Sequence, residues 1–169
     1  RRRDPSIPDL SDEALLAALD EWLPPLVAGK RKLGDIDPSA LTGALDGLLG
    51  WDGRKAVDRL APASFTTPAG SSHAIDYDAE AGPTVTVRVQ ALFGLSEHPA
   101  VGGVPLVLSL TSPAGRPIQT TRDLPSFWAG SWASVAKEMR GRYPRHPWPD
   151  DPARADPTLR TKRASQRSA

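Results

Sequence analysis

The segment Thr84-Val85-Thr86-Val87-Arg88-Val89-Gln90 alternates valine with polar side chains. A period of two places the valines on one face of a strand and the polar residues on the other. Residues 104–110, Val-Pro-Leu-Val-Leu-Ser-Leu, are almost continuously apolar and predict a central strand. A turn rich in Pro and Gly at residues 112–117 leads to a return strand at residues 118–121. We therefore expect residues 63–122 to form a small antiparallel sheet or barrel of four to five strands.

Residues 11–62 are predicted to form a helical subdomain, which follows a flexible basic lead at residues 1–10. Ser11 is a suitable N-cap for a first helix, which Pro24-Pro25 should stop because proline lacks the amide hydrogen that the helix needs. A second helix at residues 37–50 has Asp and Pro at its start and Gly at its end, and a shorter helix follows it.

Helical periodicity returns in residues 123–143, which predict a C-terminal amphipathic helix. Its apolar stripe consists of Trp128, Trp132, Val135, Met139 and Tyr143, spaced so that all lie on one face. Prolines then hold residues 144–169 extended as an arm that ends in a basic tail. The predicted fold class is therefore α+β, with helices at both ends of a small sheet.

The composition excludes several classes of protein. The 169 residues include no cysteine, which rules out disulfides, thiolate metal sites and thiol catalysis and fits a reducing compartment. No apolar run reaches the roughly 18 to 20 residues of a membrane span. The chain begins with three arginines and its one methionine is Met139, so we expect it to be a piece of a longer protein.

Signals for catalysis are weak. Ser71, His73 and Asp76 are close in sequence, but a Ser–His–Asp triad is defined by its geometry and has no characteristic short spacing. An acidic group at residues 76–80 lacks the glycine and the terminal glutamate of a calcium loop. Gly102-Gly103 lacks the lysine of a phosphate-binding loop. We expect no catalytic, cofactor or metal site here, and an autonomous hydrolase is the least favoured reading.

Positive charge gathers at the C-terminal end. Residues 137–169 carry nine Lys or Arg side chains against four acidic ones, and aromatic residues lie among them. Arginine pairs with phosphate and aromatic faces stack on unpaired bases, a combination that suits single-stranded RNA. The candidate RNA-binding residues are Lys137, Arg140, Arg142, Tyr143, Arg145, His146, Trp148, Arg160, Lys162 and Arg163. An equally weighted alternative is that Trp148 and the prolines strap the arm to the core, with Asp150 and Asp151 neutralising its arginines.

The run at residues 141–152, Gly-Arg-Tyr-Pro-Arg-His-Pro-Trp-Pro-Asp-Asp-Pro, resembles the C-terminal signature of bacterial HrpB-type ATP-dependent RNA helicases, a branch of the DEAH-box-like superfamily. The resemblance extends over about residues 14–163. It includes residues 104–108, 112–113, 116–117, 121–124, 127–128 and 157–158, Arg160 and Lys162. Arginine at positions 140 and 145 and Trp132 depart mildly from the pattern, without removing its basic character.

The resemblance implies a cytoplasmic parent that hydrolyses ATP with Mg²⁺ and remodels RNA. This chain lacks the Gly-x-x-x-x-Gly-Lys-[Ser/Thr] loop of such a motor, so ATP and Mg²⁺ would belong to the parent's core. We expect a monomeric, non-catalytic accessory domain that contributes RNA binding or positioning, with single-stranded RNA and the core of its own parent chain as partners. The alternative is an interdomain or protein–protein interaction scaffold that does not contact RNA.

Overall fold

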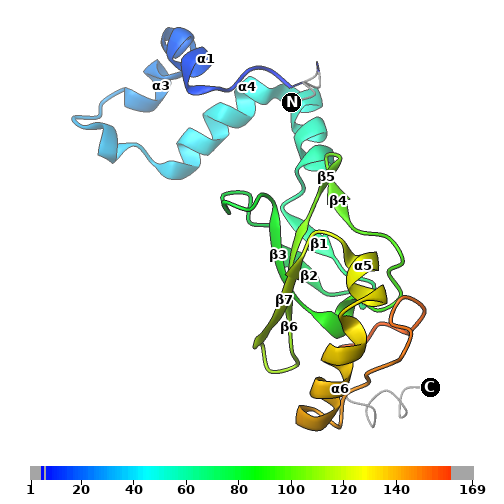
Figure 1. Cartoon of the computed structure of the whole chain (residues 1–169). Helices are drawn as coiled ribbons and strands as arrows, with labels where there is room; N and C mark the ends of the chain where they lie inside the picture. Colours follow the sequence, from blue (N-terminus) through cyan, green and yellow to red (C-terminus); the bar gives the residue numbers. More distant parts are fainter. Residues whose placement is uncertain (1–4, 6, 161–169) are drawn as a thin grey trace. The chain divides into compact units, whose positions relative to one another are not determined.

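The chain folds into two compact units, residues 1–61 and residues 62–169. The structure, a computed structural model, describes Pro5 and residues 7–160 (Figure 1). The first unit contains helices and the second combines small sheets with two further helices. The α+β class is therefore confirmed. No helix among the described residues has the length and apolar character needed to cross a membrane.

The first unit begins with three short helices, α1 (Asp12–Ala17), α2 (Leu19–Trp22) and α3 (Pro24–Val27). The side chain of Ser11 caps α1 as expected, by accepting from the Ala14 amide at 3.4 Å. Pro24 interrupts the helical path by starting a new helix at its first position, where no amide hydrogen is needed. The helix predicted before Pro24 is therefore two short ones, and a third short helix begins where the prolines were expected to stop it.

A 3₁₀ turn, η1 (Leu33–Asp35), precedes the long helix α4 (Pro38–Leu60). The carboxylate of Asp37 caps α4 through the Ser39 amide at 2.9 Å. Gly50 has φ 62° and ψ −177°, a conformation that glycine adopts without a steric penalty, and the helix kinks there. The glycine expected to end the second helix therefore joins two helical segments.

The second unit has three small sheets among its described residues. Strands β1 (Ser64–Thr66) and β2 (Ser72–Ala74) pair antiparallel, as do β4 (Ala100–Val101) and β5 (Val104–Pro105). The central sheet has the order β3-β6-β7, and its strands are β3 (Thr84–Arg88), β6 (Val107–Thr111) and β7 (Pro117–Thr121). These sheets do not close into a barrel.

The central pair corrects the expected strand directions. Strand β6 pairs with β7 antiparallel, but β3 pairs with β6 parallel, in the register Thr84↔Val107 to Arg88↔Thr111. A parallel pair needs a long crossover, which residues 89–106 supply through the 3₁₀ turn η2 (Val89–Leu92) and the β4–β5 hairpin. The alternating pattern identifies the strand but carries no information about its partner's direction.

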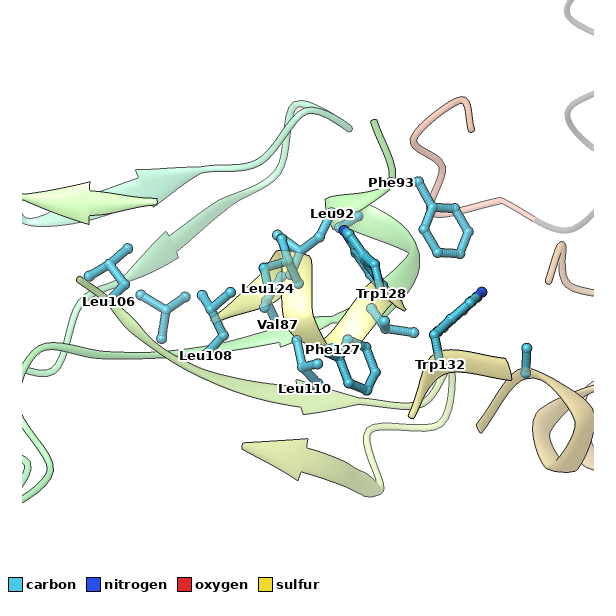
Figure 2. Packing of buried hydrophobic residues seen from close by; sticks show 14 of the residues in the cluster. Val87, Leu92, Phe93, Leu106, Leu108, Leu110, Leu124, Phe127, Trp128 and Trp132 are labelled. Atoms are coloured by element: carbon cyan, nitrogen blue, oxygen red, sulfur yellow. The ribbon is translucent and has the colours of Figure 1, made fainter. Parts of the chain in front are cut away.

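The core lies between the central sheet and helices α5 (Leu124–Ala129) and α6 (Trp132–Arg142) (Figure 2). Asp123 caps α5 by accepting from the Ser126 amide at 3.0 Å. The helix predicted at residues 123–143 breaks at Gly130, the C-cap of α5, where an added Cβ would approach the Ser126 carbonyl oxygen to 3.0 Å. The expected apolar stripe nevertheless faces inward: Trp128, Trp132 and Met139 are buried, and Val135 and Tyr143 are half-buried.

Aromatic rings form the centre of this core. The Trp132 ring lies edge-on to Trp128 and Phe93, with centroids 5.2 and 5.6 Å away, and it also contacts Phe127 and Trp148. The Trp132 indole nitrogen donates to the Pro149 carbonyl at 2.9 Å, so the arm is held directly on the core. Figure 2 shows Trp132 beside Phe93, with Phe127 and Trp128 facing the sheet residues.

We expect Trp132→Ala to lower the free energy of unfolding by about 3–5 kcal/mol, because it opens a large cavity and leaves the Pro149 carbonyl without its donor. Urea unfolding followed by near-UV circular dichroism measures the change. Val104→Ala is the control, because Val104 is 51% exposed and its loss should change stability by less than about 0.5 kcal/mol. Equal effects of the two substitutions would contradict the central place of Trp132.

Candidate nucleic-acid interface

Trp148 does not lie on the surface. Its ring is 5% exposed, packs 6.1 Å from Trp132, and donates its indole N–H to the Tyr143 carbonyl at 3.0 Å. Hydrophobic burial of a large ring and a satisfied indole donor both favour this position. The expectation that Trp148 stacks on bases therefore needs correction: in this structure its ring anchors the arm.

Arg140 also serves the arm. Its guanidinium donates twice to the Trp148 carbonyl, at 2.8 and 3.2 Å, and pairs with Asp150 at 2.5 Å. These bonds link the last turns of α6 to a segment eight to ten residues further along the chain. Arg142 pairs with Glu138 one helical turn earlier, at 3.0 Å, with both side chains more than half exposed. A solvated pair of this kind is weak, so Arg142 can exchange Glu138 for another anion at little cost.

Tyr143 and His146 adjoin each other where the helix passes into the arm. The His146 amide donates to the Tyr143 carbonyl at 3.1 Å, and the two rings meet edge-on with centroids 6.5 Å apart. The Tyr143 hydroxyl accepts from the Ser112 hydroxyl at 3.3 Å, which ties this junction to the turn after β6. Both residues are half-buried.

Burial, and then the positive charge of Arg88, lower the pKa of His146 below its ordinary value of 6.5. His146 is therefore neutral at pH 7, and its ring offers a hydrogen-bond donor and an acceptor rather than a charge. Arg88, at the end of β3, contributes to this lowering of the pKa although 58 positions separate the two residues in sequence.

The remaining candidates differ in their surroundings. Lys137 and Arg145 are exposed and form no ion pair with any part of the chain that the structure describes. Arg160 is exposed and already has an interaction partner. Lys162 and Arg163 lie outside the described residues. Among the described candidates, Lys137 and Arg145 are thus the exposed cations without an ion pair.

Two arginines near this region were missed by sequence reasoning. Arg88 ends β3 and Arg116 lies in the turn before β7; both are exposed and lack ion pairs with the described residues. Each is a single cation within a strand or turn, so neither contributes to a local run of charge. To identify them as candidates from the sequence, one would need to know that β3 pairs parallel with β6, and the local sequence pattern does not show this.

The Ser71–His73 pair does not extend to a triad. The Ser71 hydroxyl lies 2.9 Å from His73 Nε2 and 2.8 Å from the Thr67 hydroxyl. Asp76, the third residue of this group in the sequence, accepts from the Asp78 amide and pairs with Thr84 through the backbone; no contact of its carboxylate with His73 is seen among the described residues. The same part of the chain contains no group of three His, Asp or Glu side chains placed to hold a metal ion.

Comparison with known proteins connects this surface to a family. A family described as "ATP-dependent helicase C-terminal", of the HrpB type, matches residues 22–152. The chain belongs to this family. The C-terminal half of the matched region includes α5, α6 and the buried part of the arm, where the arginine and tryptophan contacts described above are found.

Solved and curated members of the family are similar in sequence and fold. The chain is 48% identical over 160 residues to the ATP-dependent RNA helicase HrpB of Escherichia coli strain K12, covering 94% of this chain and 20% of that protein. A crystal structure of the E. coli DExH-box NTPase HrpB matches 91% of this chain and 19% of that one, with a TM-score of 0.80 and 48% identity. A second crystal structure, of the E. coli DEAH/RHA helicase HrpB, matches 83% of this chain and 18% of that one, with a TM-score of 0.64 and 44% identity. The chain thus spans about a fifth of the length of these HrpB proteins.

Replacing Arg88 with Gln should raise the pKa of His146, because a removed positive charge no longer opposes protonation of the ring. The pKa should remain below 6.5, since burial, the larger cause, persists. An NMR titration that follows the His146 ring protons measures the change. Arg122→Gln is the control, because Arg122 bonds to the Ala81 carbonyl and follows the opposite end of β7. An unchanged pKa in Arg88→Gln would show that Arg88 and His146 are not neighbours.

Proposed function

We propose that this chain is the non-catalytic C-terminal accessory region of an ATP-dependent RNA helicase, where it contributes RNA binding to the motor core. ATP and Mg²⁺ would bind the motor core of the parent, a cytoplasmic protein, and nothing in this region would hydrolyse ATP. The similarity to a protein named as an ATP-dependent RNA helicase supports the helicase part of the proposal. A single observation carries the RNA part: exposed cations stand on a rigidly anchored helix and arm.

Anchoring matters because binding a flexible arm would cost conformational entropy. The Trp132 and Trp148 indoles and the Arg140 guanidinium donate to carbonyls along this segment, and prolines restrict its backbone. The backbone that carries Lys137, Arg142 and Arg145 is therefore held in place, while their side chains remain exposed. Phosphates of a single strand can pair with these groups while a base packs against half-buried Tyr143 or His146.

A second candidate function is a scaffold that holds helicase domains together without touching RNA. The burial of Trp148 and the ion pair between Arg140 and Asp150 favour it, because both groups are engaged by the chain itself. The two functions differ in their dependence on salt. Phosphate contacts release counterions and weaken steeply as salt rises, whereas a largely apolar protein interface persists.

The triple substitution Lys137→Ala, Arg142→Ala and Arg145→Ala should weaken binding of the chain to fluorescein-labelled oligouridylate. With about 0.7 of log–log salt slope per phosphate contact, loss of three contacts should reduce the slope by about 2. Fluorescence anisotropy over a salt series measures affinity and slope together. The charge-matched control is Lys30→Ala, Arg31→Ala and Lys32→Ala, in the exposed loop before η1.

Binding by the unaltered chain that disappears only in the first variant supports the RNA-binding role. Equal losses in both variants would mean that RNA responds to net charge alone. An unaltered chain that does not bind oligouridylate at low salt would exclude the RNA-binding role. The scaffold function would then be tested by the melting temperature of the whole helicase with and without residues 62–169.

A further inference from the structure

We infer that the carboxyl end of the parallel β3–β6 pair is a phosphate-binding site for an RNA strand, formed by Arg88 and Arg116 beside the junction of α6 and the arm. This inference rests on the proposed RNA-binding function and extends its surface from the arm onto the central sheet. It assigns roles to two arginines that belong to neither the basic C-terminal run nor the arm.

The strand directions bring the two arginines to one edge. Strands β3 and β6 run parallel, so Arg88 and its register partner Thr111 lie at the same end of the sheet. The chain turns back immediately after Thr111 and begins β7 at Pro117, so Arg116 lies at this end too. In an antiparallel pair, Arg88 would instead lie beside the start of β6, away from the turn.

Ser112 connects this edge to α6. The Ser112 hydroxyl accepts from the Arg116 amide at 3.1 Å and donates to the Tyr143 hydroxyl at 3.3 Å. The edge-on contact of Tyr143 with His146 continues the chain of contacts into the arm. The turn after β6 is therefore joined through Ser112 to the junction of α6 and the arm, at the end of the sheet where the register also places Arg88.

The C-terminal segment also returns to this part of the sheet. The Gly94 amide donates to the Pro152 carbonyl at 2.9 Å, and the Thr158 amide donates to the Gln90 carbonyl at 3.1 Å. Gln90 is two residues beyond Arg88, so the last described part of the arm runs past the end of β3. Thr158 thus lies close to the end of β3.

The charge at this edge is uncompensated. Arg54, Arg140, Arg142 and Arg154 pair with carboxylates, whereas Arg88 and Arg116 have no such partner in the described chain. Like charges held on one edge repel each other, and a bound anion removes that repulsion. Exposed guanidinium groups bind phosphate oxygens bidentately, which makes an RNA backbone the fitting partner.

The test measures oligouridylate binding by anisotropy over a salt series for the 169-residue chain and for Arg88→Ala with Arg116→Ala. The pair of substitutions should weaken binding about tenfold at low salt and reduce the log–log slope by about 1.4, at about 0.7 per lost phosphate contact. The charge-matched control, Arg31→Ala with Arg122→Ala, should retain the affinity and slope of the unaltered chain. Circular dichroism and melting temperature establish that each variant is folded.

The results of this experiment test the proposed Arg88–Arg116 site separately from the RNA-binding function on which it rests. If the unaltered chain binds RNA and both double variants bind equally well, the site is excluded and the RNA-binding function stands. If the unaltered chain does not bind, both fail. An independent measurement uses the unaltered chain alone: the amide NMR signals of Arg88, Ser112 and Arg116 should shift as oligouridylate saturates the chain. Their constancy at saturation would overturn the site without any substitution.

Discussion

The structure of the second unit depends on the burial of one indole. Trp132 begins α6, yet its ring contacts Phe93 after η2, two aromatic residues of α5 and Trp148 of the arm. Segments distant in sequence therefore share a single packing contact, and the indole N–H is satisfied by the Pro149 carbonyl rather than by water. Because a buried indole needs both apolar neighbours and an acceptor, it fixes the arm's backbone as well as the helix packing.

This dependence explains why the arm's residues divide into two groups. Trp148 and Arg140 lie at the points where the arm meets α6, and their polar atoms bond to the chain itself. Lys137 and Arg145 lie outside these contacts and remain exposed without carboxylate partners among the described residues. A guanidinium that already makes three bonds would have to break them before it bound phosphate, whereas an exposed one needs only to lose water.

The sequence predicted what local periodicity encodes. The stripe from Trp128 to Tyr143 was identified correctly because helical spacing alone places its members on one face. The break at Gly130 was missed, since the stripe keeps its period across it. The direction of β3 relative to β6 could not be predicted either, because apolar and polar side chains alternate in the same way in parallel and antiparallel strands.

The sequence shows which residues of the candidate site carry charge or an aromatic ring, but not which of them stay exposed. The basic run was visible because its charges are adjacent in sequence, but which of them stay exposed depends on contacts such as Arg140 with Asp150, ten residues apart. The sequence allowed two readings of Trp148, and only the packing against Trp132 decides between them. Arg88 and Arg116 were not predicted, because they are far apart in sequence and only strand pairing brings them to the same end of the sheet.

The residues that hold the arm rigid are therefore different from the residues that give this surface its positive charge. Indoles, prolines and one arginine immobilise the arm, and this immobilisation involves no net attraction for RNA. The charges that could attract RNA come from the outer side of α6, where Arg142 has only a solvated ion pair with Glu138, and from the end of the sheet, where Arg88 and Arg116 have no carboxylate partner in the described part of the chain. High salt should screen the contacts that these cations make with an anion but leave the shape of the surface unchanged. The backbone that carries the cations is held by apolar packing and hydrogen bonds, which salt screens little.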